Sequence, residues 1–133
     1  MGKKVLVVDD DPDIRLVNVT IIEENGYTPL VATNGEEGLD LIQKEIPDLV
    51  ILDVLMPKQS GLRLYSVLKT DKALKGIPVV ILSGIAKRTF LRSQKALVEF
   101  GGDKVPEPEI YLEKPVESEE LADIIKKILR FTT

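Results

Sequence analysis

The sequence contains no histidine and no cysteine. Without histidine, the chain has no imidazole for acid–base catalysis, no Ser-His catalytic triad, no histidine metal ligand and no phosphohistidine of its own. Without cysteine, it has no disulfide, no thiolate nucleophile and no zinc–sulfur site. Any metal site must therefore consist of oxygen ligands, which favour hard cations such as Mg²⁺.

Aromatic residues, excess charge and long apolar runs are also scarce. There is no Trp, and the three Tyr and three Phe are too few for an aromatic platform that stacks nucleic-acid bases. Lys and Arg number 18 against 22 Asp and Glu, so the formal net charge is -4 and direct nucleic-acid binding is not expected. Apolar runs such as residues 5–8 are far shorter than the roughly 18 residues of a membrane span. We therefore expect a cytoplasmic protein with no membrane insertion.

The composition is typical of one globular domain. The chain has 133 residues, of which 44% are hydrophobic and 30% charged, and a domain usually has roughly 100–200 residues. No repeat, low-complexity stretch or linker interrupts it. We expect a single domain over residues 1–133, with no output domain.

Apolar patterning predicts five strands that alternate with five helices. Short β-branched runs are expected to form buried strands over residues 4–8, 28–32, 49–53, 79–82 and 110–112. Amphipathic stretches are expected to form helices over about residues 12–25, 36–45, 62–74, 86–100 and 119–130, with Asp11 capping the first. This alternation implies a parallel sheet with helices on both faces, in which functional groups gather beyond the carboxyl ends of the strands.

Polar side chains of complementary chemistry follow four of the predicted strands. Asp9 and Asp10 follow the first strand, Asp53 ends the third, Ser83 follows the fourth and Lys114 follows the fifth. Carboxylates that share one pocket repel each other unless a cation is present, and Mg²⁺ binds to carboxylates, waters and phosphate. A carboxylate nucleophile beside Mg²⁺, with an ammonium and a hydroxyl nearby, is typical of phosphoryl transfer.

The order of these residues resembles the receiver domain of two-component response regulators, of the chemotaxis-regulator type. The resemblance covers essentially the whole chain, and the motifs that carry it are Asp9-Asp10, Asp53 with Pro57 and Gly61, Ser83, and Lys114-Pro115. It implies a flavodoxin-like α/β fold, which is a doubly wound five-stranded parallel sheet in the order 2-1-3-4-5 with five helices. It also implies Mg²⁺ as the cofactor.

Carried over residue by residue, the resemblance implies a phosphorylation site at Asp53. Asp10 would bind Mg²⁺ directly, together with Asp53 and the backbone carbonyl of Leu55. Asp9 would complete the acidic pocket through a metal-bound water. Asp53 itself would be the phosphoacceptor and would form an acyl phosphate.

The resemblance also implies roles for residues that contact or sense the phosphoryl group. Ser83 would hydrogen-bond one phosphoryl oxygen, and Lys114 would pair with another. Tyr111 matches the aromatic side chain that moves inward when the hydroxyl is drawn to the phosphate. Structural roles fall to Pro57, Gly61 and Pro115, and the Lys-Pro bond is usually cis in this family.

The function implied is that of a phosphorylated signalling switch and not of a turnover enzyme. A sensor histidine kinase, a phosphotransfer protein or a small phosphodonor would supply the phosphoryl group to Asp53. Phosphorylation would then change the surface of the fourth helix, fifth strand and fifth helix toward a downstream target that the sequence does not identify.

Two other functions fit parts of the same pattern. One is a Mg²⁺-dependent phosphohydrolase with an aspartate nucleophile, but such enzymes commonly have a second acid at the position of Leu55. The other is a phosphorylation-independent interaction module on the same fold, which does not need an acidic pocket. The residues themselves also have structural interpretations, since Ser83 can bond a backbone group and Lys114 can form a surface pair with Glu113.

Two features depart from the usual receiver pattern or add to it. The stretch between Ser83 and Lys114 is longer than is typical of the family, with the surplus around residues 100–109 or in a longer fourth helix. Leu55 and Ile85, each two positions after a site residue, are apolar and cannot orient a water for hydrolysis. We therefore hypothesise that the phosphoryl group decays slowly.

The predicted first helix carries more apolar residues than its core face needs. Ile14, Val17 and Ile21 are expected to face the sheet. Leu16 and Val19 then point elsewhere. We hypothesise that they form a docking ridge for a kinase or phosphotransfer partner.

Overall fold

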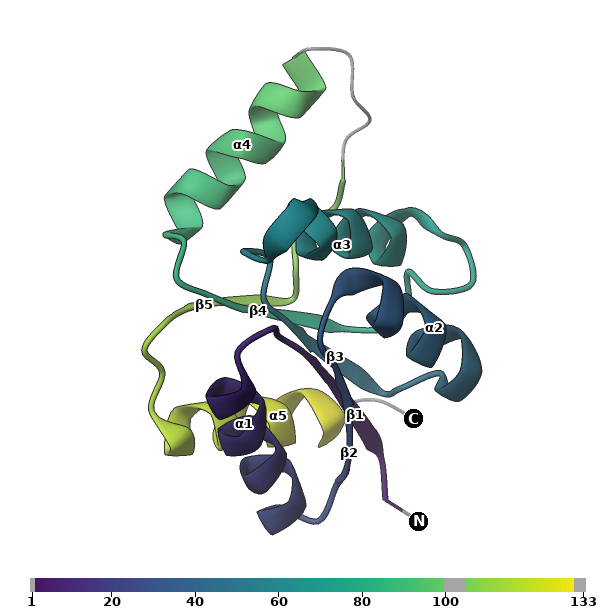
Figure 1. The fold of residues 1–133 in the computed structure, drawn as a ribbon, viewed down its shortest axis with the longest axis vertical. Helices are drawn as coiled ribbons and strands as arrows, with labels where there is room; N and C mark the ends of the chain where they lie inside the picture. The colour runs from purple at the N-terminus through teal and green to yellow at the C-terminus, as the bar shows by residue number, and fades with distance from the viewer. Residues whose placement is uncertain (1, 100–104, 131–133) are drawn as a thin grey trace.

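The structure is a five-stranded sheet surrounded by five α-helices (Figure 1). The computed structural model describes residues 2–99 and 105–130, without the side chains of residues 59 and 97–99. The strands are β1 (Lys4–Val8), β2 (Thr28–Ala32), β3 (Leu49–Leu52), β4 (Val79–Ser83) and β5 (Ile110–Glu113). The helices are α1 (Pro12–Glu24), α2 (Gly35–Glu45), the 3-10 helix η1 (Pro57–Gln59), α3 (Ser60–Thr70), α4 (Lys87–Glu99) and α5 (Ser118–Arg130).

The strand order is β2-β1-β3-β4-β5, and every neighbouring pair is parallel. Parallel neighbours cannot be joined by a tight turn, so each connection crosses over the sheet through a helix. The order reverses between β1 and β3, which is the point where such sheets usually place their functional groups. The flavodoxin-like fold class and the order 2-1-3-4-5 predicted from the sequence are confirmed.

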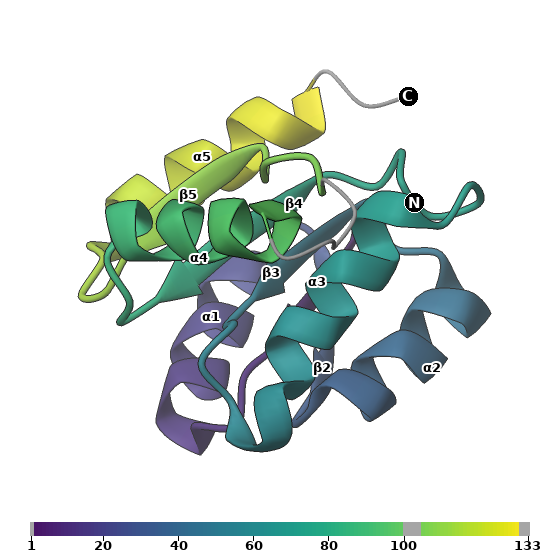
Figure 2. The same cartoon turned by 90° about the horizontal axis from the view of Figure 1, so that it is seen from above.

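Each face of the sheet has its own apolar core (Figures 1 and 2). Helices α1 and α5 cover one face, and α2, α3 and α4 lie on the other. Because side chains alternate along a strand, Leu6 and Val8 pack on the α2–α3 side, whereas Val5 and Val7 pack on the α1–α5 side. The central strands are therefore apolar on both faces, and their polar residues are confined to the strand ends.

Side-chain hydrogen bonds explain where α1 begins and where α3 ends. Asp11 Oδ1 accepts the N–H of Asp13 at 2.9 Å and begins α1, as predicted. The third helix was predicted over residues 62–74, but it ends before Asp71. Asp71 Oδ1 accepts the N–H of Ala73 at 2.8 Å, and this local turn replaces the next helical turn. The predicted end of the helix was therefore wrong.

The core face of α1 also differs from the prediction. Val17 was expected to face the sheet, but it is 49% exposed, and Leu16 beside it is 66% exposed. Asn18 is buried in place of Val17, together with Ile21 and Ile22. Val19 is only half-buried, so the exposed apolar pair on this helix is Leu16-Val17 and not Leu16 with Val19.

Helix α4 extends away from the rest of the molecule (Figure 1), and the side that carries Phe90 packs against the core. Its apolar anchor is Phe90, which is 3% exposed and packs in the same core as α3. Part of the surplus predicted after this helix, residues 100–104, lies outside the described residues. The described part, residues 105–109, returns beside α3 and leads into β5, where Tyr65 donates a hydrogen bond to the carbonyl of Pro106.

The helices are amphipathic. In α5, for example, Leu121, Ile125 and Leu129 are buried, whereas Lys126 and Lys127 are exposed. Across residues 2–99 and 105–130, the structure has no helix with the length and apolar character of a membrane span. The cytoplasmic location expected from the composition stays a prediction.

Candidate functional site

Three carboxylates meet at the carboxyl edge of the two central strands. Asp9 directly follows β1 and is 2% exposed, whereas Asp53 directly follows β3 and is 5% exposed. The Asp53 N–H donates to the Val8 carbonyl at 3.0 Å, which holds the two strand ends together. Asp10 is exposed at the mouth of the pocket, and one carboxylate oxygen from each of the three residues lies within 4.8 Å of the others. The structure thus brings together the acidic residues that the sequence placed at separate strand ends.

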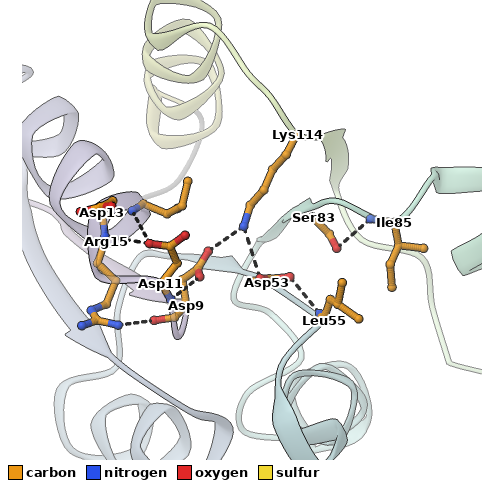
Figure 3. A network of polar contacts seen from close by, with 10 residues as sticks. Asp9, Asp11, Asp13, Arg15, Asp53, Leu55, Ser83, Ile85 and Lys114 are labelled. Atoms are coloured by element: carbon orange, nitrogen blue, oxygen red, sulfur yellow. Dashed lines mark hydrogen bonds and ion pairs between the residues drawn. The ribbon is translucent and has the colours of Figure 1, made fainter.

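Among the described residues, Lys114 is the ammonium that contacts these carboxylates (Figure 3). Its Nζ lies 3.1 Å from Asp9 Oδ2 and 3.3 Å from Asp53 Oδ2. The backbone N–H of Lys114 donates to the Ser83 carbonyl at 2.8 Å, and the Lys114–Pro115 bond is cis. Glu113 instead accepts the Lys87 N–H at the start of α4, and within the described residues Lys114 forms its ion pairs with Asp9 and Asp53 and none with Glu113.

Burial and unbalanced charge perturb the groups in this pocket. Burial raises the pKa of Asp9, and the Asp11 N–H and Lys114 only partly offset that effect. Burial alone would lower the pKa of Lys114, but its hydrogen bond to Asp9 and the charge of Asp53 raise the pKa overall. Within the described residues, three carboxylates, of which Asp9 and Asp53 are buried, face one ammonium. This excess of negative charge is the condition that a divalent cation relieves.

Backbone contacts hold the loop after β3 against the pocket. The Leu55 N–H donates to Asp53 Oδ1 at 2.8 Å, so the peptide of Leu55 lies beside the carboxylate. Pro57 begins η1 directly after this loop. A Cβ on Gly61 would lie 2.3 Å from the backbone oxygen of Asp53, so only glycine allows α3 to start this close to the loop.

Arg15 is a supporting residue that the sequence did not reveal. Its Nη1 donates to the backbone carbonyl of Asp9 at 2.8 Å. The bond ties the first turns of α1 to the loop that carries Asp9 and Asp10. No motif marks this residue, since an arginine on a helix next to an acidic loop is most often solvated.

Ser83 and Tyr111 both bond the backbone of Ile85 on the other side of the pocket. Ser83 is fully buried, and its Oγ accepts the Ile85 N–H at 3.2 Å (Figure 3). The Tyr111 hydroxyl donates to the Ile85 carbonyl at 2.5 Å, and its ring is buried. Within the described residues, the Ser83 hydroxyl makes no hydrogen bond to Asp53 or Lys114. The structural interpretation of Ser83, a bond to a nearby backbone group, therefore describes this conformation.

Comparison with known proteins points to one family. The family model for the response regulator receiver domain matches residues 5–126. The polar-differentiation response regulator DivK of Brucella anthropi is 31% identical over 97% of this chain and 98% of its own length. The probable transcriptional regulator ycf27 of Guillardia theta is 34% identical over 98% of this chain and 46% of its own length. A solved structure of a putative response regulator from Chloroflexus aurantiacus J-10-fl has a TM-score of 0.77 and 30% identity, and covers 98% of this chain and 99% of that one.

The extent of these matches differs between relatives. The chain spans about half the length of the first curated relatives that it matches. It spans nearly all of DivK. The match to the family model and the fold shared with the response regulator from Chloroflexus aurantiacus agree with this similarity. The chain belongs to the response regulator receiver domain family of two-component signalling.

Proposed function

We propose that this chain accepts a phosphoryl group on Asp53. Receiver domains are signalling modules that bind Mg²⁺ at an acidic pocket and interact with histidine kinases or phosphotransfer proteins. The observation that carries the proposal is the position of the Asp53 carboxylate, which lies among two other carboxylates and 3.3 Å from the Lys114 ammonium. A buried carboxylate in surplus negative charge is costly as a structural feature alone, so a function explains its presence better.

The residues of the pocket fit a hard divalent cation. All the donors are oxygens, the carboxylates lie within 4.8 Å of one another, and the single ammonium does not balance them. Asp10 and Asp53 would hold Mg²⁺ directly with the Leu55 backbone carbonyl, and Asp9 would hold it through a water. When bound, Mg²⁺ neutralises negative charge on the carboxylates and on phosphoryl oxygens.

The proposed reaction needs a donor outside this chain. Since the chain has no histidine, a phosphohistidine must belong to a sensor histidine kinase or a phosphotransfer protein. An oxygen of Asp53 attacks the phosphorus, the bond from phosphorus to the donor nitrogen breaks, and its electron pair stays on the donor imidazole. The product is an acyl phosphate on Asp53, whose oxygens Lys114 and Ser83 would bind.

Binding of Ser83 to the phosphoryl group would change the conformation around β4 and β5. The Ser83 hydroxyl, which accepts the Ile85 N–H, would donate its own O–H to a phosphoryl oxygen and draw the Ile85 backbone with it. Tyr111 is held on the same residue, Ile85, so the change would reach the surface formed by α4, β5 and α5. The chain then acts as a phosphorylation-dependent switch toward a downstream target, and not as an enzyme with turnover.

Exposed apolar side chains on α1 and in the loop after β3 would receive the partner. Leu16, Val17 and Leu55 are each at least 49% exposed, and large apolar side chains are typical anchors of protein interfaces. Joint substitution Leu16→Asp and Val17→Asp should slow phosphotransfer from the partner kinase about tenfold or more and leave phosphorylation by acetyl phosphate unchanged. Thr20→Asp, on an exposed position of the same helix, is the matched control; an equal effect of this control would contradict the docking site.

Mass spectrometry of the intact chain tests the proposed function. After incubation with acetyl phosphate and Mg²⁺, the wild type should gain one phosphoryl group and Asp53→Asn should gain none. EDTA should prevent the gain, and the exposed control Asp40→Asn should behave as the wild type. A wild type that stays unmodified would contradict the proposal and favour an interaction module. Sustained release of inorganic phosphate over many turnovers would instead favour a phosphohydrolase.

A further inference from the structure

Three aromatic rings form a continuous row from α3 through α4 to β5. The ring of Phe90 in α4 lies 5.5 Å from that of Tyr65 in α3, edge to face at 75°. On its other side it lies 5.2 Å from the ring of Tyr111 in β5, tilted by 37°. Both geometries are favourable for aromatic pairs. Phe90 is thus the central residue that connects three elements, and Figure 2 shows α4 running between α3 and β5.

One end of this aromatic row reaches the proposed phosphorylation site. The Tyr111 hydroxyl donates to the carbonyl of Ile85, and the N–H of Ile85 donates to Ser83 Oγ. A displacement of the Tyr111 ring therefore acts on the backbone of Ile85, whose N–H is bonded to Ser83 Oγ. The row and the site are joined by two hydrogen bonds through one residue.

The other end of the row is fixed to the segment that precedes β5. The Tyr65 hydroxyl donates to the carbonyl of Pro106. One turn further along α3, Lys69 Nζ lies 2.6 Å from Glu109 Oε1, which also accepts the Val79 N–H at 2.6 Å. Tyr65 consequently has little freedom to follow Phe90 if that ring moves. Hydrogen bonds hold Tyr65 and Tyr111 at the two ends of the row. Contact along the row therefore depends on the shape of the Phe90 side chain between them.

We propose that Phe90 is a positioning residue for phosphoryl transfer, which holds Tyr111 on Ile85 and so sets the orientation of the Ser83 hydroxyl. This inference rests on the proposed function, in which Ser83 binds a phosphoryl oxygen. Phe90 itself does not touch the reacting atoms. It acts because its ring is 3% exposed and fills the space between two tyrosines. A side chain without a ring would leave Tyr111 without this ring contact.

A double-mutant cycle with a second, phosphate-free readout tests the proposal. Phe90→Leu keeps an apolar side chain in the core but removes both ring contacts, and Ser83→Ala removes the hydroxyl that the row is proposed to orient. We expect Phe90→Leu to slow phosphorylation by acetyl phosphate about 3- to 10-fold in the Ser83 background, and to change it little in the Ser83→Ala background. Leu74→Val, a buried substitution in the same core but outside the row, should have no such background dependence.

Amide hydrogen exchange of Ile85 supplies the readout that needs no phosphate. Phe90→Leu should raise the exchange rate of the Ile85 N–H several-fold, and Leu74→Val should not. An equal slowing by Phe90→Leu in both Ser83 backgrounds would overturn the proposal, because the effect would then bypass the hydroxyl. Unchanged Ile85 exchange would overturn it as well. If the wild type is not phosphorylated at all, the proposed function fails, and Ile85 exchange alone decides whether Phe90 positions this loop.

Discussion

Two clusters of partly buried charge differ in how well their charges balance. At the carboxyl edge of the sheet, three carboxylates share one ammonium, that of Lys114. Between α3 and the segment before β5, Lys69 pairs one to one with Glu109, which also accepts the Val79 N–H. The first cluster keeps excess negative charge, whereas the second is neutral and its acceptor is shared with the backbone.

This difference in charge balance distinguishes a candidate binding site from a structural ion pair. A neutral, hydrogen-bonded pair has no electrostatic need for a further ion, so it fits a structural role. An unbalanced pocket is costly until a cation arrives, so it fits binding of Mg²⁺ and of a phosphoryl group. Removal of a charge should therefore have opposite effects on stability in the two clusters.

The largest effect on stability is expected at the balanced pair. Glu109→Ala leaves the Lys69 ammonium without a partner, and that side chain is only 4% exposed. We expect a loss of about 3 kcal/mol in the free energy of unfolding, measured by urea denaturation. Lys69→Met should cost less, because the remaining Glu109 side chain is 42% exposed and can be hydrated. Equal costs, or a larger cost for Lys69→Met, would contradict this asymmetry.

The next effect concerns the lifetime of the phosphoryl group in the unbalanced pocket. Leu55 follows Asp53 by two positions and is 60% exposed, and its side chain offers no hydrogen bond to a water. Leu55→Gln supplies such a group, so it should speed dephosphorylation about tenfold or more. A decay time course of the purified phosphoprotein measures this rate, with Leu55→Met as the apolar control. A wild-type phosphoryl group that is lost within seconds would refute the hypothesis of slow decay.

Neutralisation of one carboxylate in the pocket should raise stability when metal is absent. Burial raises the pKa of Asp9 above its unfolded value. The stability that this carboxyl contributes is therefore present below the unfolded pKa and lost as pH rises through the folded pKa. Asp9→Asn should thus increase the free energy of unfolding by roughly 0.5–1 kcal/mol at neutral pH in EDTA. Urea denaturation with Asp40→Asn as control measures it, and a destabilised Asp9→Asn would break the contrast between the clusters.

The smallest effect is an alkaline loss of stability beside the balanced pair. Burial raises the pKa of the Tyr65 hydroxyl, and the charges of Glu109 and Glu107 raise it further. The unfolded chain ionises this tyrosine near pH 10, while the folded chain keeps it neutral, so stability falls as pH rises above about 10. Tyr65→Phe should remove part of this decline, measured by denaturation at pH of about 9 and about 11. The same decline in both proteins would show that Tyr65 does not contribute.

The sequence predicted most of the fold because the central strands are apolar on both faces. Runs such as residues 4–8 and 49–52 have the length and β-branched composition typical of buried strands, and their alternation with helices fits a parallel sheet. The end of α3 was missed because the side chain of Asp71 forms a local turn, which apolar periodicity does not report. The rotation of α1 was missed because Asn18 occupies a core position that polarity alone assigns to the surface.

The site was predictable to the same extent and for a related reason. The charged residues at strand ends stand out against apolar runs, so Asp9, Asp53 and Lys114 could be placed together before any coordinates. The ring contacts of Phe90 and the bond from Arg15 to the Asp9 carbonyl could not, because they join residues whose types are ordinary for helices. Such contacts depend on tertiary packing and leave no pattern in one sequence.

The location of the phosphoryl group tests the central claim most directly. The chain is phosphorylated with acetyl phosphate and Mg²⁺, reduced with borohydride, digested and sequenced by tandem mass spectrometry. Borohydride converts the acyl phosphate of an aspartate to homoserine, so homoserine at position 53 is the predicted result. Homoserine at position 9 or 10, or a phosphate ester that survives on Ser83, would contradict the assignment of Asp53 as the phosphoacceptor.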